Sequence, residues 1–298
     1  MTLRLATRRS PLALVQARYV QGRLEALGLL SELVLLDTKG DRDVAADLST
    51  LGGQGVFAVE IQRALLNGDA DVAVHSAKDL PSVTPEGLSL VSVPERRDPA
   101  DVLVGRSLAG LGPGATVATG SPRRRALLLE RRPDLRVVPL RGNMATRLSA
   151  AGTNGVDAVV AAMAALERLD EGELASERLD PSWFVPQVGQ GALALEARDD
   201  DEHTRDALRA INDASAFRAV LCERAFLGEL GAGCSIPAGA HAEVEGTTLT
   251  LRGVMIAPDG TKSVRTELSG DDPLALGTRL ARHLRDDLGG GALLGWDS

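Results

Sequence analysis

One pattern occurs twice in the first two thirds of the chain, and it restricts the fold more than any other feature. Three pairs of segments match in the same order: ATRRSPLAL (6–14) with ATGSPRRRAL (118–127), LVLLDTKGD (33–41) with LRVVPLRGN (135–143), and NGDADVAVHSA (67–77) with NGVDAVVAAMA (154–164). An ordered repeat of this length indicates one supersecondary unit used twice. We therefore expect two similar α/β domains with a cleft between them.

Each copy of the repeat alternates strand and helix patterns. In the first copy, short apolar strands over 3–7, 32–38 and 71–76 alternate with helices over 10–28 and 56–68. Ser10 is placed as the N-cap of its helix, with Pro11 at the first helical position, and Asn67-Gly68 ends the second helix. The second copy has strands over 115–120, 135–140 and 157–162 and a helix that begins at Ser121-Pro122. This order predicts a mostly parallel sheet covered by helices.

Proline-containing stretches mark two crossings between the domains, at 94–99 and 181–186. The segment 188–200 is predicted to be one strand that returns to the first domain. From about Ile211 a helix, a glycine loop, strands over 242–260 and 263–269 and a last helix over 273–288 predict a small α+β domain. The expected division is domain 1 at 1–98 with 190–209, domain 2 at 99–189 and domain 3 at 210–298.

Composition excludes several classes of protein. Aromatic residues make up 2% of the chain and the net charge is −8, which disfavours nucleic acid as a partner. The chain shows neither an export signal nor a run of about 18 apolar residues, so we expect a cytoplasmic protein with no membrane partner. Two cysteines and four scattered histidines predict neither a disulfide framework nor a metal site.

Basic and hydroxyl side chains gather at the predicted strand-to-helix junctions of both copies. Such junctions present backbone N–H groups and the positive end of the helix dipole to anions, and guanidinium groups bind carboxylates or phosphates in bidentate fashion. This indicates a substrate with several anionic groups, although solvated arginines at helix ends are the alternative. The residues are Arg8, Arg9, Ser10, Thr119, Ser121, Arg123, Arg124, Arg125, Arg141 and Arg147.

The segment AVHSAKDLP (73–81) follows a buried strand at the end where α/β sheets usually bind ligands. Asp79 could donate and accept a proton there, while Ser76 and Lys78 grip substrate acids. The alternative is a plain Asp-Leu-Pro turn beside a satisfied buried His75.

Two glycine-rich stretches complete the candidates. Residues 39–57 are long and polar, as in a lid over a site, or else form a simple flexible loop. Cys234 lies in GAGCSIPAG (231–239), where small neighbours give access to the thiol; it is either a nucleophile or an inert loop thiol. Cys222 lies in an apolar helical pattern and is predicted to be core.

Ten motifs together resemble the porphobilinogen deaminase family, in order from residue 4 to about 260: ATRRSPLA, TKGD, GGQGVF, HSAKD, ERRDP, TGSPRRR, LRGNMATR, VGQGA, ERAFL and GAGCSIP. The resemblance implies two lobes like those of type II periplasmic binding proteins plus a third domain. It also implies a dipyrromethane cofactor, built from two substrate molecules and joined by a thioether to Cys234.

The implied reaction belongs to tetrapyrrole synthesis: four porphobilinogens are condensed head to tail with loss of ammonia, and water releases hydroxymethylbilane. Asp79 is implied as the catalytic acid and base that also stabilises an azafulvene-like cation. Cofactor contacts are implied for Lys78, Asp79, Ser76, Thr119, Ser121, Arg123, Arg124, Arg141 and Gly142. Substrate contacts are implied for Arg8, Ser10, Gln16, Arg141, Arg147, Arg168 and Gln190, and lid positions for Lys39, Gln54 and Phe57.

The resemblance further suggests a monomer and a handover of product to uroporphyrinogen-III synthase. Departures from the family pattern are Gln54 in place of a usual lysine, Gly120 in place of a usual serine, and Ala232 in place of a frequent glycine. A two-lobed protein that binds a carboxylate or phosphate without chemistry is the alternative function, since the repeat and its helix-end arginines suit it equally well.

Overall fold

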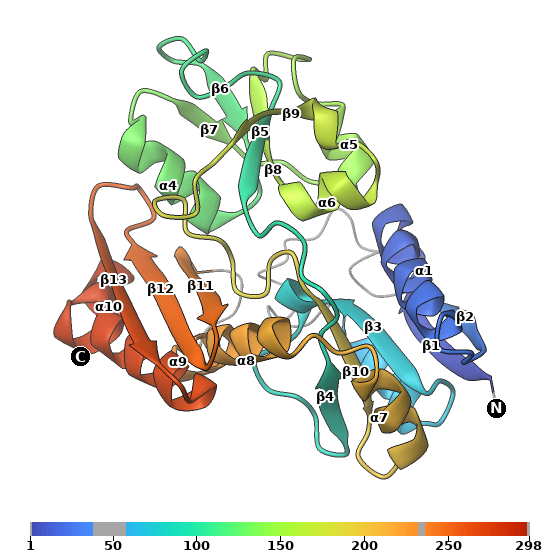
Figure 1. Cartoon of the computed structure of the whole chain (residues 1–298). Coiled ribbons are helices and arrows are strands. Elements are labelled where there is room, and N and C mark those ends of the chain that lie inside the picture. Colours follow the sequence, from blue (N-terminus) through green and yellow to red (C-terminus); the bar gives the residue numbers. More distant parts are fainter. Residues whose placement is uncertain (1, 38–57, 232–235, 297–298) are drawn as a thin grey trace.

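The computed structural model describes residues 2–37, 58–231 and 236–296, and these form three sheets with their covering helices (Figure 1). We call each sheet with its covering helices a unit and number the three units. The first unit has the strand order β2-β1-β3-β10-β4, the second β7-β6-β8-β5-β9 and the third β11-β12-β13.

The first unit is a mixed sheet with helices on both faces. Strands β1 to β3 are parallel, and β10 is antiparallel to both its neighbours, β3 and β4. Alternate residues of β1 face opposite layers: Leu3 and Leu5 pack with α1, whereas Ala6 packs with α3. The elements are β1 (Leu3–Arg8), α1 (Pro11–Glu25), β2 (Ser31–Leu36), α3 (Val59–Leu66), β3 (Val72–Ser76), η1 (Ala77–Asp79), β4 (Leu88–Ser92), β10 (Leu193–Arg198) and α7 (Glu202–Arg209).

The second unit repeats this plan, as the sequence predicted. One detail recurs at the same place: the Asp71 carboxylate accepts the backbone N–H of Arg4, and the Asp157 carboxylate accepts that of Thr116. The elements are β5 (Asp101–Val104), β6 (Thr116–Ala118), α4 (Pro122–Arg131), β7 (Arg136–Val138), α5 (Met144–Leu148), β8 (Ala158–Ala162), α6 (Met163–Arg168), η2 (Gly172–Leu174) and β9 (Ala175–Arg178).

The two units exchange strands. β5 follows the first crossing and enters the second sheet, and β10 follows the second crossing and returns to the first sheet, as predicted for 188–200. The prediction of one continuous strand there was wrong, because Gly189 and Gly191 have left-handed φ values of +73° and +86° and turn the chain before β10 begins. β5, which follows the first half of the repeat along the chain, therefore belongs to the second sheet. β10, which follows the second half, belongs to the first sheet.

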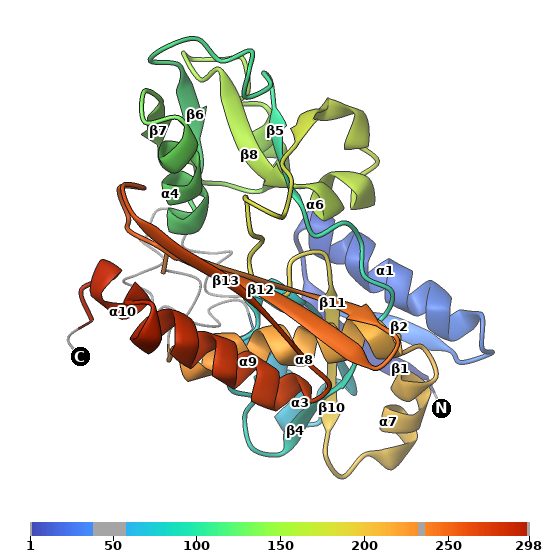
Figure 2. The ribbon, with the colours of Figure 1, turned by 60° about the vertical axis from the view of Figure 1, so that its left-hand side comes forward.

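The third unit is a small antiparallel sheet with α8 and α9 packed on one face (Figure 2). The stretch predicted as 242–260 is two strands joined by a turn at Gly246. The last helix ends earlier than predicted and continues as a π-helical turn. The elements are α8 (Ala214–Glu229), β11 (Ala238–Glu245), β12 (Thr248–Ile256), β13 (Ser263–Gly270), α9 (Pro273–Arg282), η3 (His283–Asp287) and α10 (Gly290–Leu293).

Candidate functional site

The turn Ser76–Asp79 lies at the carboxyl end of the buried strand β3. Ser76 is the last strand residue, and residues 77–79 form the single 3₁₀ turn η1. Ser76, Lys78 and Asp79 are half-buried, whereas Ala77 and Leu80 are buried and hold the turn in the core. The polar side chains are therefore carried by a rigid backbone, as a reaction site requires.

Cationic side chains surround this turn. Burial lowers the pKa of the Lys78 ammonium to about 8, and the Arg124 guanidinium adds to that effect; the Asp79 and Asp101 carboxylates oppose it. Burial also lowers the pKa of Arg147, again with a contribution from Arg124. Positive charges that lower one another's pKa have been gathered at a cost in free energy. An anionic ligand would remove that cost.

Asp101, the first residue of β5, has a carboxylate that binds both Arg124 and its neighbour Arg123. It is fully buried and accepts hydrogen bonds from Arg123 Nη2 at 2.7 Å and from Arg124 Nη2 at 2.6 Å. Arg124 Nε donates a third at 3.0 Å, and Gln190 Nε2 donates a fourth at 2.8 Å. Burial alone would raise the pKa of Asp101, but Arg123 and Arg124 outweigh it and lower the pKa to about 2. Asp101 is therefore ionised at neutral pH.

Arg123 and Gln190 lie deeper than the sequence suggested. Arg123 is 2% exposed, and its Nη1 also donates to the carbonyl of Val185 at 2.7 Å. Gln190 was expected to face the cleft, yet it is fully buried and its amide donates to the Pro99 carbonyl. Their contact with a cofactor or substrate stays a prediction. In this structure both residues join the second unit to the crossing segments.

The two Ser-Pro helix starts have the predicted caps. Ser10 Oγ accepts the N–H of Ala13 at 3.3 Å, and Ser121 Oγ accepts that of Arg124 at 3.4 Å. Thr119 is buried beside the second cap and accepts the N–H of Ser121. Both helix N-termini therefore present the arrangement that binds anions in α/β proteins.

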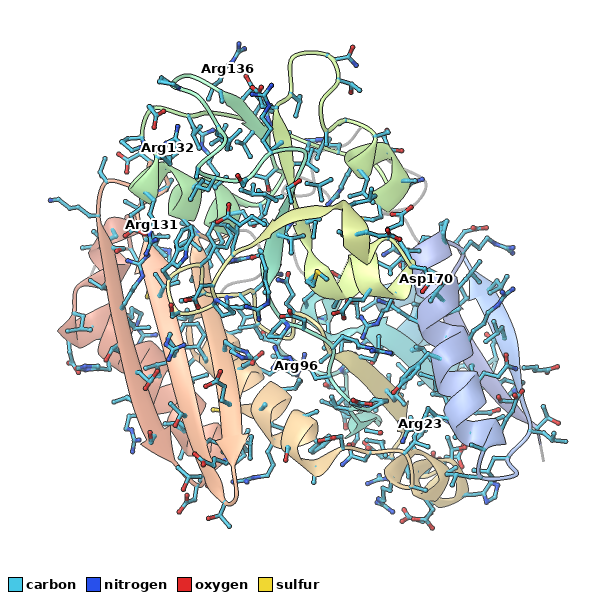
Figure 3. All side chains as sticks on the ribbon, turned by 45° about the horizontal axis from the view of Figure 1, so that its top comes forward. Arg23, Arg96, Arg131, Arg132, Arg136 and Asp170 are labelled. Carbon is cyan, nitrogen blue, oxygen red and sulfur yellow. The ribbon has the colours of Figure 1, made fainter. Side chains whose placement is uncertain are left out.

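Arg168, at the end of α6, reaches the second crossing. Its Nη2 donates to the carbonyl of Gly191 at 2.8 Å, and Gly191 also accepts the backbone N–H of Arg97. Burial, with the nearby Arg97 charge, lowers the pKa of Arg168 to about 10. Figure 3 shows the neighbouring Asp170 beside α1, so this part of the second unit faces the first.

Other predicted residues lie apart from this network or outside the described residues. Arg8 is half-buried at the end of β1, Gln16 is buried in α1, and Arg141 is exposed in the loop before α5. Gly142 has a φ of +105°, and a Cβ there would be 2.9 Å from the Thr146 side chain, so glycine is required. Cys234, Lys39, Gln54, Phe57 and Ala232 lie outside the described residues. Gly120 packs against the Leu140 carbonyl, which a Cβ would approach to 2.7 Å.

The described end of the cysteine loop lies at the network. Gly239 in β11 packs so closely that a Cβ would be 2.7 Å from the carbonyls of Val185 and Pro186 and 3.0 Å from Arg123 Cδ. The other cysteine, Cys222, is fully buried in α8, and burial raises the pKa of its thiol to about 12. Cys222 is therefore a core residue, as predicted, and not a nucleophile.

Sequence reasoning missed the buried acids that organise the site. Asp101, Glu196 and Glu223 are all fully buried and each binds at least one cationic or histidine partner. Glu196 faces His75 at 3.0 Å between the side chains and accepts from Gln62. The available signal was a single acid inside an apolar run: DVLV, LALEA and AVLCERAF.

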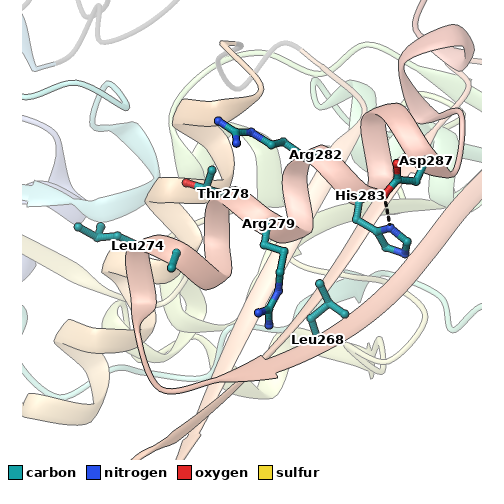
Figure 4. Close-up of a pocket in the computed structure, with 8 residues that line it drawn as sticks. Leu268, Leu274, Thr278, Arg279, Arg282, His283 and Asp287 are labelled. Carbon is teal, nitrogen blue, oxygen red and sulfur yellow. Dashed lines mark hydrogen bonds and ion pairs between the residues drawn. The ribbon is translucent and has the colours of Figure 1, made fainter.

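A depression of about 760 Å³ on the third unit is separate from this network (Figure 4). Its charged side chains already have protein partners: Arg282 binds Glu229, His283 binds Asp287, and Arg279 donates to the Ser269 carbonyl. We do not assign it a role in the site.

Two classes of site are not found in the part of the chain that the structure describes. Within residues 2–37, 58–231 and 236–296, no cluster of three or more potential metal ligands occurs. Over the same ranges, no helix has the length and apolar character needed to span a bilayer.

Comparison with known proteins gives the family. Residues 3–206 match the family described as porphobilinogen deaminase, dipyromethane cofactor binding domain, and residues 217–286 match the porphobilinogen deaminase C-terminal domain. The porphobilinogen deaminase of Syntrophotalea carbinolica is 45% identical over 95% of this chain and 92% of its own length. Those of Trichlorobacter lovleyi and Geobacter metallireducens are each 43% identical, over 95% and 96% of this chain and 92% of their own.

Solved structures give a weaker likeness. The methionine binding protein MetQ covers 72% of this chain and 92% of its own length at 13% identity, with a TM-score of 0.45. The fold class is instead evident from the strand orders themselves. By its motifs, its two domain matches and its relatives, the chain belongs to the porphobilinogen deaminase family.

Proposed function

We propose that this protein is a transferase that condenses four porphobilinogen molecules head to tail, releases ammonia and delivers hydroxymethylbilane. The observation that carries the proposal is the charge balance at the Ser76–Asp79 turn. Among the residues that the structure describes, Asp101 binds Arg123 and Arg124, and the charges of Arg124, Arg147, Asp79 and Asp101 act on Lys78, so that four cationic side chains accompany two carboxylates. Porphobilinogen has an acetate and a propionate arm, so an oligopyrrole is a polyanion that suits this excess of positive charge.

The same excess fits the dipyrromethane of the family. When bound, this group supplies a covalent primer to which porphobilinogen units are added. We propose Cys234 as its attachment point, since Cys222 is enclosed in the core and the chain has two cysteines. The acidic arms would be held by Lys78, Ser76, Thr119, Ser121, Arg123, Arg124, Arg141 and the backbone at Gly142.

Asp79 is assigned the proton transfers. Asp79 lies on the η1 turn next to Lys78, and its charge acts on both the Lys78 ammonium and the Arg147 guanidinium. It would donate a proton to the departing amine of porphobilinogen and later accept the proton lost from the pyrrole ring. Its charge would also stabilise positive charge on the substrate between those events.

Incoming porphobilinogen would be bound from both units. Arg8, Ser10 and Gln16 belong to the first helix start, and Arg147 and Arg168 come from α5 and α6. α6 contacts α1, and Tyr19 of α1 is close enough to act on Arg168, so Arg168 lies near the first helix. We also propose Gln190 as a substrate contact if the crossing segments rearrange, and Lys39, Gln54 and Phe57 as parts of a lid.

Further parts of the proposal concern organisation and partners. We propose domain boundaries at 1–98 with 190–209, 99–189 and 210–298, because the sheets divide the chain close to these positions. A cytoplasmic monomer that passes its product to uroporphyrinogen-III synthase is proposed from the family resemblance.

The test is to incubate the purified protein with porphobilinogen and to measure porphyrin absorbance after oxidation. We expect turnover by the unmodified protein and a loss of about 10²–10⁴-fold in kcat for Asp79→Asn, which keeps the side-chain shape but cannot transfer the proton. The folded state of the variant is checked by its thermal unfolding midpoint. A protein that binds porphobilinogen without consuming it would instead be the two-lobed binding protein.

A further inference from the structure

The segment 187–192, which joins the second crossing to β10 and is here called the junction segment, lies directly against the Ser76–Asp79 turn. The backbone N–H of Ala77 donates to the carbonyl of Ala192 at 3.0 Å, and Gln187 Nε2 lies 3.5 Å from the carbonyl of Lys78. Gly189 is closest: a Cβ there would be 2.8 Å from the Ala77 carbonyl carbon and 2.9 Å from Lys78 N. Both atoms belong to the peptide that carries Lys78, so this contact is backbone against backbone.

A buried carboxylate of the third unit holds the other side of the junction segment. Glu223 Oε2 in α8 accepts the N–H of Gly189 at 2.7 Å, and its Oε1 accepts that of Ala242 at 2.9 Å. Arg96 binds the same carboxylate in bidentate fashion at 2.6 and 3.1 Å, near the middle of the molecule in Figure 3. Burial opposes the ionisation of Glu223, but Arg96 and His241 outweigh it and lower its pKa to about 2.

The next residue, Gln190, connects the junction segment to the second unit. Its side chain binds Asp101, to which Arg123 and Arg124 also bind, and its carbonyl accepts Arg96 Nε at 2.9 Å. Two consecutive residues therefore contact all three units. Apolar packing supports the arrangement, because Ala77 and Leu80 share a buried cluster with Ala216 and Val220 of α8.

We propose that Gly189 and Glu223 are positioning residues: Glu223 fixes Gly189, and Gly189 fixes the Ala77–Lys78 peptide and through it the side chains of Lys78 and Asp79. The inference rests on the proposed function for the role of Asp79. It gives the third unit a part in the reaction that is separate from carrying Cys234. A displacement of a reacting group by about 1 Å can cost about 10²-fold in rate, so a contact of this kind has a measurable effect.

The main experiment compares Gly189→Ala with Gly68→Ala in the complete protein. Both glycines have similar left-handed φ values, +73° and +76°, so both variants bear the same backbone cost. Nothing lies within 4 Å of a Cβ at Gly68, whereas a Cβ at Gly189 meets the Lys78 peptide. We expect Gly189→Ala to lower kcat by about 10- to 100-fold with less than about a twofold change in KM. Gly68→Ala should keep the kcat of the unmodified protein.

A second measurement does not depend on activity. The chain has three lysines, so ¹³C-lysine labelling gives few NMR signals, and the titration of Lys78 can be followed beside that of the exposed Lys262. Among the described residues, the charged groups that act on Lys78 include Arg124, Arg147, Asp79 and Asp101. We expect Gly189→Ala to shift the Lys78 midpoint by about half a pH unit or more and to leave Lys262 unchanged.

Glu223→Gln is the second variant and should change kcat and the Lys78 titration in the same way as Gly189→Ala. If Gly189→Ala matches Gly68→Ala in both readouts, the inference is overturned while the proposed function stands. If the unmodified protein does not consume porphobilinogen, the proposed function fails and the Lys78 titration alone decides the inference. If Gly189→Ala shows both effects but Glu223→Gln folds and shows neither, the role of Glu223 is overturned.

Discussion

The two Ser-Pro helix starts have the same cap, yet their arginines lie on opposite sides of it, before Ser10 and after Ser121, and have different environments. At the first, Arg9 is 57% exposed by side chain and pairs with the equally exposed Asp37. At the second, Arg123 and Arg124 are buried on Asp101. The exchanged strands differ as well. Asp101 of β5 lies opposite Ala162, the last residue of β8, whereas Leu193 of β10 lies opposite Ser76, the last residue of β3.

The corresponding position is therefore a carboxylate in the second unit and a leucine in the first. The residues that follow β3 and β8 also differ. Lys78 and Asp79 come after β3 in the first unit, whereas the apolar start of α6, Met163–Ala165, comes after β8 in the second unit. One half of the repeat thus carries the polar turn that we propose as the reaction site, and the other carries a buried carboxylate that binds Arg123 and Arg124. A repeated fold does not imply a repeated role.

The largest stability effect is expected at Asp101, which distinguishes the two halves. Asp101→Asn leaves two buried guanidiniums without their carboxylate and should lower the free energy of unfolding by about 3–5 kcal/mol. The matched control is Asp98→Asn on the same crossing, whose partner Arg178 is half exposed, and it should cost about 1 kcal/mol. Urea unfolding measures both. Equal costs would mean that the buried anchor has no special importance.

Acid should lower the free energy of unfolding over the pH range in which Asp101 and Glu223 become protonated. Asp101 and Glu223 have folded-state pKa values lowered to about 2, so the stability they contribute is present above their unfolded values near pH 4 and is lost as the pH falls toward 2. Each accounts for about 2–3 kcal/mol. Urea midpoints between pH 5 and pH 2 should therefore fall more steeply for the unmodified protein than for Asp101→Asn. Parallel curves would contradict the assignment.

Removal of the Lys78 charge is expected to raise the free energy of unfolding at neutral pH. The pKa of Lys78 is lowered to about 8, so its charge penalises the folded state below pH 8, and the penalty disappears as the pH rises from 8 through the unfolded value near 10.5. Lys78→Met should stabilise the cofactor-free protein at pH 7 by about 1–2 kcal/mol and lose that advantage above pH 10.5. A destabilised variant at pH 7 would show that the ammonium is well compensated without a ligand.

The smallest effect on stability is expected at the serine N-caps, which both halves of the repeat have. Ser10→Ala and Ser121→Ala each remove one N-cap hydrogen bond and should each cost about 1 kcal/mol in thermal or urea unfolding. Unequal costs would indicate that the two helix starts differ in capping as well as in the environment of their arginines.

Much of the fold could be predicted because it depends on local patterns. The repeat, the Ser-Pro caps, the Asn67-Gly68 helix end and the return of 188–200 to the first sheet were all in the sequence. The short strands β4, β5 and β9 were not predicted, since their periodicity is too brief to distinguish from loop. The reversal before β10 depends on backbone packing at Gly189 and Gly191, which no local pattern records.

The residues of the candidate site also divide into those that the local sequence predicts and those that it does not. The Ser76–Asp79 turn and the arginines were found from residue type and place, whereas Asp101, Glu196 and Glu223 were not, because their partners are distant in the chain. Arg96 and Glu223 are 127 residues apart. A buried acid in an apolar run shows that a partner exists but does not identify it.

We propose that this chain carries a two-ring primer on Cys234, and intact-mass spectrometry of the denatured protein tests that proposal most directly. Protein made in cells that synthesise porphobilinogen should show the chain plus two pyrrole units in the unmodified protein and in Cys222→Ala. Cys234→Ala should show the bare chain. A bare chain in the unmodified protein, or the same added mass on Cys234→Ala, would contradict the account.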